Sequence, residues 1–286
     1  MLKQAGLELT PRALHLLDCY ADGQDSRHFR LGIDAPQPGD LAVIPGQFFM
    51  LGVPGFGEAP FTYVSPPDEG GEFSALIRRS GRLTTRLFEL EPRALLGYRG
   101  PFGKGWPLLL GSRRVLVVAG GCGLAPLAGW VEEALRHSAP LQLRVLYGAR
   151  SAATQVLGRE RDYWRQVLPL IETLDQGGPE ALRGSPLAQL DRLFAEEPPQ
   201  VVLCCGPEAF MLAIAKTCVR RGVAADNIWL SVERRMHCAV GLCGHCYIAD
   251  SYACVDGPTY RYDHYLQLLA RGNTGRATGE LGVGPC

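Results

Sequence analysis

The sequence predicts an all-β domain, then an α/β domain built on a doubly wound parallel sheet, and finally a small cysteine-rich module. Three observations support this order. The first part has short apolar runs separated by Gly- and Pro-rich turns, and the middle part alternates apolar strands with helical segments. Near the C-terminus, four of the ten cysteines fall within seventeen residues. A chain of 286 residues is also longer than one hydrophobic core usually supports.

Composition excludes several classes of function. Lys plus Arg number 29 and Asp plus Glu number 29, so no net charge attracts nucleic acid or an anionic membrane surface. The sequence has no run of eighteen apolar residues and no signal-peptide pattern, which predicts a soluble, cytoplasmic protein without direct membrane insertion. Thiols stay reduced in such a compartment, so metal or redox chemistry explains clustered cysteines better than disulfides do.

The expected all-β domain covers residues 1–110. Apolar runs such as 41–51 and 71–77 alternate with turn signals at 36–40 and 54–55. This spacing is typical of an antiparallel barrel or sandwich, because each turn ends one short strand and starts the next.

The expected α/β domain covers residues 111–232. Strands that alternate with helices favour a parallel sheet with helices on its faces. The predicted strands are 115–119, 141–147, 200–205 and 227–232, and the predicted helices include 127–137 and 208–221. A cysteine module is expected at 233–262, followed by a C-terminal tail at 263–286.

Two glycine turns follow predicted strands of this sheet. Gly120, Gly121 and Gly123 lie between a strand and a helix, where bare backbone and the helix N-terminus can receive a pyrophosphate. Gly206 and Pro207 follow the third strand. Since the carboxyl ends of parallel strands meet at one edge, both turns are expected to face one crevice. Gly also occurs in such loops for steric reasons alone, and the common G-x-G-x-x-G spacing is absent.

The four clustered cysteines have the spacing of a plant-type two-iron two-sulfur site. Cys238, Cys243, Cys246 and Cys254 are separated by four, two and seven residues. Structural zinc is the alternative, and His237 and His245 would be spare ligands. Zinc sites usually present two Cys-x2-Cys pairs, whereas only Cys243 and Cys246 form one here, so we favour iron and sulfide.

The α/β domain resembles the nicotinamide domain of the ferredoxin-reductase superfamily. Members carry a Gly-Gly-x-Gly-x-Ala-Pro turn, a Tyr-Gly-x-Arg segment and a Cys-Gly-Pro segment, which occur here in that order from Gly120, Tyr147 and Cys205. The resemblance implies that Cys205 is a catalytic residue beside the nicotinamide ring. It assigns NAD(P)H binding to Gly120, Gly121, Gly123, Leu124, Ala125, Pro126, Arg150, Gly206 and Pro207. Arg150 would lie near the adenosine end, or would be a solvated loop charge.

The same superfamily places a FAD-binding β-barrel before this domain. Its FAD lies against an Arg-x-Tyr/Phe-Ser/Thr strand and a later Gly-x-x-Thr helix start. Phe61 and Thr62 match the aromatic and hydroxyl positions, but the usual Arg is replaced near Glu58 or Ala59. The resemblance assigns FAD to Pro60, Phe61, Thr62, Tyr63, Gly81 and Thr84, with added charge from Arg78, Arg79 and Arg82. Alternatively, the aromatics are ordinary strand residues and Thr84 is an ordinary helix cap.

The three regions together resemble the gamma subunits of soluble nickel-iron hydrogenases. The electron-transfer subunit of anaerobic sulfite reductase, its B chain, is related, and the dihydroorotate dehydrogenase electron-transfer subunit ranks third because its last cysteine usually follows a longer gap. The resemblance implies an electron-transfer subunit that connects NAD(P)H, FAD and a 2Fe-2S cluster to partner subunits of the iron-sulfur or hydrogenase type. No acid-base pair or nucleophile for substrate chemistry stands out, which favours a subunit over a complete enzyme.

Two other functions fit the same residues. The chain could act as a stand-alone NAD(P)H-dependent ferredoxin-type reductase, or as a non-catalytic scaffold that contains zinc. The residues leave open the choice between NADH and NADPH, the direction of electron flow and the acceptor.

Overall fold

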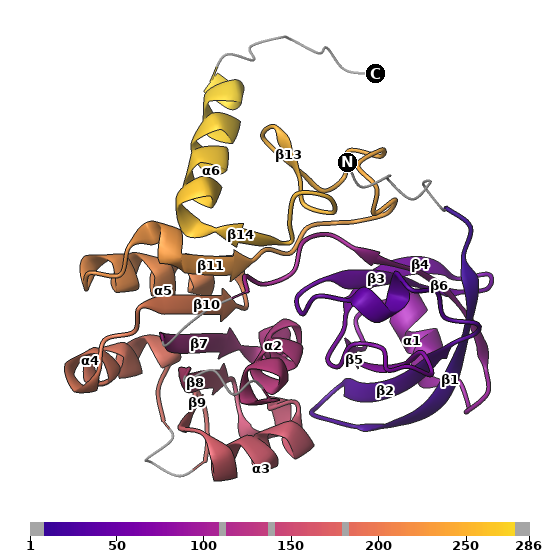
Figure 1. The fold of residues 1–286 in the computed structure, drawn as a ribbon, viewed down its shortest axis with the longest axis horizontal. Coiled ribbons are helices and arrows are strands. Elements are labelled where there is room, and N and C mark those ends of the chain that lie inside the picture. Colours follow the sequence, from indigo (N-terminus) through magenta and orange to yellow (C-terminus); the bar gives the residue numbers. More distant parts are fainter. Residues whose placement is uncertain (1–8, 109–112, 137–140, 179–182, 278–286) are drawn as a thin grey trace.

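The computed structural model describes residues 9–108, 113–136, 141–178 and 183–277, and these form two six-stranded sheets with a loop module beside them (Figure 1). The first sheet is antiparallel and the second is mainly parallel with helices on both faces. This architecture confirms the predicted order of a β-barrel, an α/β domain and a small C-terminal module.

The first sheet closes into a barrel. Its strand order is β4-β3-β6-β1-β2-β5, and the amide of Val64, just after β4, donates to the Ser74 carbonyl of β5 at 2.8 Å. The interior is packed with aromatic rings, including Phe49, Phe73 and Tyr98. The elements are β1 (Arg12–Ala21), β2 (Ser26–Ile33), η1 (Asp40–Ala42), β3 (Phe48–Val53), β4 (Gly57–Thr62), β5 (Glu72–Arg78), α1 (Arg82–Phe88) and β6 (Leu95–Phe102).

The second sheet has the order β14-β11-β10-β7-β8-β9, in which β14 alone runs antiparallel to its neighbour. From β7 the chain first adds β8 and β9 on one side, and then adds β10 and β11 on the other side. The strand order thus changes direction between β7 and β10, and α/β folds bind ligands at such a position. The elements are β7 (Arg114–Gly120), η2 (Gly121–Leu124), α2 (Ala125–Arg136), β8 (Gln142–Ala149), η3 (Ala152–Thr154), α3 (Gly158–Val167), β9 (Leu170–Leu174), α4 (Pro186–Glu196), β10 (Val201–Cys205), α5 (Glu208–Arg220), η5 (Ala225–Asn227), β11 (Ile228–Ser231), β14 (Thr259–Arg261) and α6 (Tyr262–Ala277).

Two strands of this sheet and one helix beside it were not predicted from sequence. β9 and α4 occupy the stretch between α3 and β10, and β14 is the antiparallel edge strand. The apolar residues of α2 and α3 pack on one face of the sheet, whereas those of α4, α5 and α6 pack on the other. The helix expected near 265–269 is the middle of the longer α6.

The cysteine module is a loop between two neighbouring strands of the parallel sheet. It leaves β11 and returns in β14, and it contains a two-stranded ribbon of β12 (Tyr247–Ile248) and β13 (Ser251–Tyr252). Its base contacts the chain that leaves the barrel: the Lys104 amide donates to the Gly257 carbonyl at 2.5 Å, and the Thr259 hydroxyl donates to the Gly105 carbonyl at 2.6 Å.

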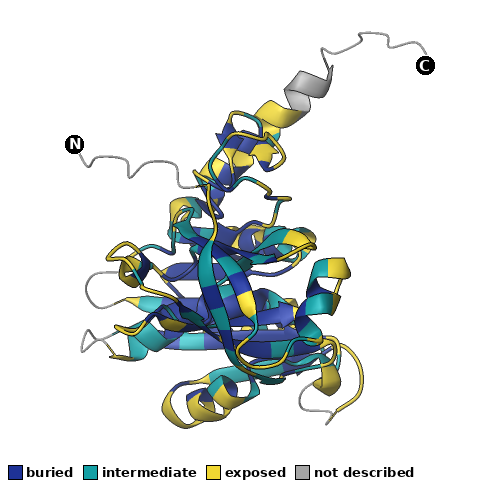
Figure 2. Cartoon of the chain, turned by 90° about the vertical axis from the view of Figure 1, so that its right-hand side faces the viewer, coloured by how far each residue is buried: buried dark blue, intermediate teal, exposed yellow. Residues whose placement is uncertain are grey.

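One apolar cluster joins the barrel, the second sheet and the cysteine module. Phe48 and Met50 of β3 belong to it together with Leu230 of β11 and with Cys246 and Cys254. Figure 2 shows buried residues concentrated in the strands and exposed ones on loops and outer helix faces. In the part of the chain that the structure describes, no helix has the length and apolar character needed to span a membrane.

Barrel stability is expected to depend on the Tyr63–Tyr98 pair, whose buried hydroxyls share a 2.7 Å hydrogen bond. Tyr98→Phe leaves the Tyr63 hydroxyl buried without its partner, and should cost about 1–3 kcal/mol of unfolding free energy. Thermal unfolding at matched cofactor content measures the loss, and an unchanged melting temperature would contradict the assignment.

Candidate redox site

The two glycine turns touch each other at the carboxyl edge of the second sheet. A Cβ atom on Gly123 would lie 2.6 Å from the carbonyl carbon and oxygen of Cys205 and 2.7 Å from the Gly206 nitrogen. Gly206 itself has a φ of +154° and a Cβ there would lie 3.3 Å from the Gly120 Cα. The turns after β7 and β10 therefore form one continuous surface, as expected from the sequence.

The residues assigned to NAD(P)H include half-buried turn residues and buried residues that support them. Nothing lies within 4 Å of the Cβ direction of Gly121, whose φ is +57°. Leu124 and Ala125 are buried and pack beneath the turn, and Pro126 accepts a 2.6 Å hydrogen bond from Trp106. Pro207 precedes α5 and stands beside Gly120. Arg150 is exposed just after β8, so it lies at the same edge of the sheet.

Cys205 is buried with 1% of its surface exposed, and its Sγ lies 3.9 Å from the Ser231 carbonyl oxygen. Burial, with the nearby Glu233 carboxylate, raises the pKa of this thiol to about 12. The residue is therefore a neutral thiol at physiological pH, able to shape a nicotinamide site but not to act as a thiolate nucleophile.

Cys122 is a site residue that sequence reasoning missed. It lies in the glycine turn, half-buried, where burial raises the pKa of its thiol. The Ser26 hydroxyl and the Arg78 guanidinium, both on the barrel, oppose this increase in the pKa. The turn therefore faces the barrel across the junction of the two domains. Its position inside the glycine motif was the available signal, although only the other residues of that motif were assigned to the cofactor.

The strand assigned to FAD presents two different faces. Pro60 and Thr62 stand opposite Met50 and Phe48 of β3, whose side chains pack toward the second domain. The Thr62 hydroxyl donates to the Gln47 carbonyl at 3.2 Å. Tyr63, in contrast, is buried in the barrel core. Phe61 is half-buried, and its ring is tilted against that of Phe49 with 6.3 Å between the ring centroids.

Thr84 serves its own turn. Its hydroxyl accepts hydrogen bonds from the Ser80 and Gly81 amides at 2.8 and 2.9 Å and donates to the Gly81 carbonyl at 3.0 Å. One donor and two acceptor positions are all that a hydroxyl has, so none is left for a ligand. Gly81 adjoins open space on its Cβ side.

The four module cysteines converge, and backbone amides point at their sulfurs. Cys238 Sγ accepts from the Val240, Leu242 and Cys243 amides at 3.3–3.5 Å, and Cys254 Sγ accepts from Gly241 at 3.3 Å. Positive φ angles make this geometry possible, at Ala239, Gly241 and Gly244. Amide donors stabilise thiolate sulfur, so the loop fits a metal-sulfur centre.

Two of the sulfurs form a close pair, with Cys246 Sγ 3.3 Å from Cys254 Sγ. Cys243 contacts Cys238 through its backbone amide, which donates to the Cys238 Sγ at 3.4 Å. Of the residues described, only Asp22, His28 and Glu160 form a group of three such ligand atoms mutually within 4.8 Å, so no three of the four sulfurs do.

The rings of the two histidines beside the cysteines contact each other. The rings of His237 and His245 meet edge to face at 4.4 Å between centroids. Cys243 is exposed, whereas Cys246 and Cys254 are buried. The cysteine site is therefore open to solvent on one side.

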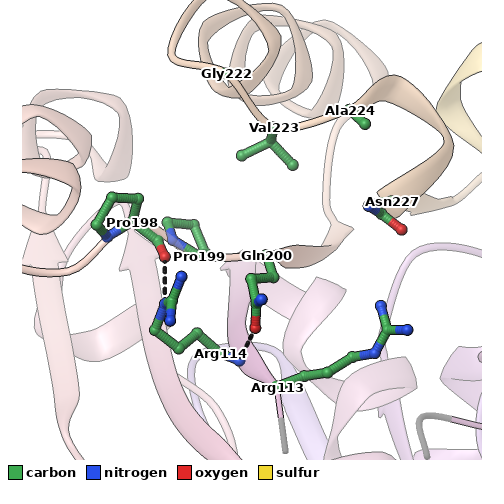
Figure 3. Close-up of a pocket in the computed structure, with 9 residues that line it drawn as sticks. All are labelled: Arg113, Arg114, Pro198, Pro199, Gln200, Gly222, Val223, Ala224 and Asn227. Atoms are coloured by element: carbon green, nitrogen blue, oxygen red, sulfur yellow. Dashed lines mark hydrogen bonds between the residues drawn. The ribbon is translucent and has the colours of Figure 1, made fainter.

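A separate depression of about 360 Å³ lies at the amino-terminal edge of the second sheet (Figure 3). Arg114 at the start of β7 donates to the Pro198 carbonyl within it, and Gln200 precedes β10. This edge is opposite the glycine turns, so the depression is not the expected nicotinamide site.

Family models match three successive segments of the chain. Residues 16–106 match an oxidoreductase FAD-binding domain, residues 117–216 an oxidoreductase NAD-binding domain, and residues 233–265 the iron-sulfur cluster binding domain of dihydroorotate dehydrogenase B. The barrel thus lies in the segment matched by the FAD-binding model, the glycine turns in the segment matched by the NAD-binding model, and the cysteine loop in the segment matched by the iron-sulfur model.

Several proteins are similar over most of their length. Sulfhydrogenase 1 subunit gamma of Pyrococcus furiosus is 29% identical, over 88% of this chain and 92% of the relative. A probable dihydroorotate dehydrogenase B (NAD(+)) electron transfer subunit of Methanopyrus kandleri is 35% identical over 76% and 78%. A solved chain described in work on the NADH-dependent reduced ferredoxin-NADP oxidoreductase has a TM-score of 0.74 at 23% identity, over 94% and 95%, and shares the fold.

Gly123→Val is expected to separate the two glycine turns. The added side chain would begin 2.6 Å from the Cys205 backbone, which cannot move without displacing β10. We expect a lower melting temperature and at least a tenfold loss of NAD(P)H affinity, a loss of about 1.4 kcal/mol. Gly39→Ala, which meets nothing within 4 Å, is the control. Unchanged affinity in Gly123→Val would show that the turns do not bind the nucleotide.

Cys205 is expected to resist alkylation in the folded protein. At pH 8 its thiol is neutral and buried, whereas the half-buried Cys19 can be reached. Iodoacetamide labelling followed by peptide mass spectrometry should modify Cys19 in the folded protein and Cys205 only after denaturation. Rapid labelling of native Cys205 would contradict the neutral, buried thiol.

Proposed function

The chain belongs to the family of FAD- and NAD-binding iron-sulfur electron-transfer subunits represented by sulfhydrogenase gamma and dihydroorotate dehydrogenase B electron-transfer subunits, and we propose that it carries electrons between NAD(P)H and a partner protein. The observation that supports this most is one apolar cluster that contains residues of β3, of the cysteine loop, and of β7 and β10, the two strands that end in the glycine turns. FAD exchanges hydride with nicotinamides and single electrons with iron-sulfur clusters.

We propose that the cysteine module holds a 2Fe-2S cluster. A tetrahedral zinc site with Zn–S bonds of about 2.3 Å would bring every pair of sulfurs to about 3.8 Å. Here, instead, Cys246 and Cys254 form one close pair and no three of the four sulfurs lie mutually within 4.8 Å, which suits two irons with two thiolates each. The ligands are Cys238 and Cys243 on one iron, and Cys246 and Cys254 on the other.

For FAD we propose contacts on the outer side of β4. Pro60 and Thr62 face the second domain, and Phe61 lies between them with one side in the barrel. Tyr63 and Thr84 support these contacts from within, because their hydroxyls are already bonded inside the barrel and the turn. Gly81 leaves room for the ligand beside that turn.

For the nicotinamide cofactor we propose the surface formed by the two turns. Gly120 and Gly121, which are half-buried, present backbone to the dinucleotide, while the buried Gly123 and Gly206 allow the turns to meet. Pro207 lies beside the backbone of Gly120. Leu124, Ala125 and Pro126 hold the turn from beneath, and Arg150 at the same edge is available to an adenosine phosphate. Cys205 forms the wall of the ring site as a neutral thiol.

The partner is proposed to approach at Cys243, the exposed ligand. Leu242, Tyr247 and Val255 are exposed apolar residues of the same loop module. A hydrogenase-type partner agrees with similarity over nearly the whole of a sulfhydrogenase gamma subunit. A dihydroorotate dehydrogenase B catalytic subunit is the second candidate, supported by the match of residues 233–265 and by higher identity to those electron-transfer subunits.

Cys254→Ser is expected to abolish the visible absorption and the EPR signal of the cluster while FAD stays bound, because the flavin contacts lie in the barrel. Anaerobic NAD(P)H should still bleach the flavin. Cys19→Ser, outside the module, is the control and should keep both chromophores. Purified protein that contains zinc but neither iron nor sulfide, or that lacks flavin, would contradict the proposed function.

A further inference from the structure

One buried arginine connects the flavin strand with the cysteine loop. Arg99 of β6 keeps only 4% of its side chain exposed. Its Nε and one terminal nitrogen donate to the two carboxylate oxygens of Glu58 at 3.1 and 2.5 Å. Its other terminal nitrogen donates to the Cys238 carbonyl at 3.1 Å. The guanidinium also lies 5.5 Å from the centre of the Phe102 ring.

Glu58 belongs to β4, close to the position where the superfamily motif has its Arg. Its carboxylate is held by Arg99 in a two-point contact, so its charge is paired with the guanidinium that reaches the cysteine loop. The residue that departs from the motif thus has a defined partner, and that partner contacts a proposed cluster ligand.

Both the sulfur and the backbone carbonyl of Cys238 accept hydrogen bonds. The sulfur accepts from backbone amides, and the carbonyl accepts from the positively charged guanidinium of Arg99. Charges act strongly over short distances when they are shielded from water, and the potential of an iron-sulfur centre depends on nearby charge and hydrogen bonding. A cation favours the more negative, reduced state of such a centre, whereas an anion opposes it.

We propose that Arg99 and Glu58 are positioning residues that set the reduction potential of the cluster in opposite directions, Arg99 raising it and Glu58 moderating the increase. This inference rests on the proposed function, because it requires the cluster. The pair also fixes Cys238 relative to β4, so one contact sets both the position and the potential of this ligand.

The test is an EPR-monitored redox titration of the holoprotein, with the flavin potential as an internal reference. Arg99→Gln should shift the cluster midpoint potential negative, and Glu58→Gln should shift it positive. The second shift should be smaller, because Glu58 is 30% exposed and its charge is partly screened. The double variant should lie between the two single variants. Asp40→Asn removes a carboxylate from another buried Arg pair of the barrel and should leave the potential unchanged.

Opposite shifts distinguish this role from a purely structural one, in which both variants would loosen the same loop and change the cluster in the same way. Shifts of equal sign, or an unchanged potential in Glu58→Gln with its cluster intact, would overturn the inference. If Arg99→Gln loses its cluster, Glu58→Gln decides the sign alone, and Arg99→Lys should retain a potential nearer the wild-type value. Wild-type protein without a cluster signal would instead refute the proposed function.

Discussion

The apolar contact on the outer face of β3 is the constraint on which the rest of the structure depends. Phe48 and Met50 project from the barrel into the same cluster as Leu230 of the second sheet and Cys246 of the cysteine loop. The hydrophobic effect is not directional, so the orientation of the three regions depends on how the shapes of the packed side chains fit together. A directional contact is added where the chain leaves the barrel, by the hydrogen bond from the Lys104 amide to the Gly257 carbonyl. One apolar cluster therefore contains residues of the barrel, the second sheet and the cysteine loop, and the relative placement of these three regions follows from its packing.

Sequence reasoning recovered the features that depend on neighbouring residues. The apolar strand before Gly120, the glycine turns and the cysteine spacing all have local patterns, and each appears in the structure. β9 was missed because Leu170–Leu174 is short and carries a Glu and a Thr, so its apolar signal is weak. β14 was missed because three residues beside Pro258 give no periodicity, and only pairing with β11 makes them a strand.

The parts of the site that sequence reasoning missed are set by contacts between distant residues. Arg99 and Cys238 are 139 positions apart, and nothing near either residue predicts their hydrogen bond. Cys122 obtains its setting from Ser26 and Arg78 of the barrel in the same way. Side-chain direction was equally inaccessible: Tyr63 and Thr62 are neighbours in the FAD motif, yet one fills the barrel and the other faces the second domain.

The return of the chain from the cysteine loop into β14 gives the module an unusual status. The loop begins after Ser231 and ends before Thr259, and these two residues are paired in the neighbouring strands β11 and β14. The module is therefore a long loop between two paired strands and not a domain on a linker. An appendage can be removed by one cut, whereas a cut before β14 would also detach the sheet edge and α6. The sulfur site is therefore held to the second sheet by both ends of its loop, and one of these ends continues from the strand paired with β10, which carries Cys205.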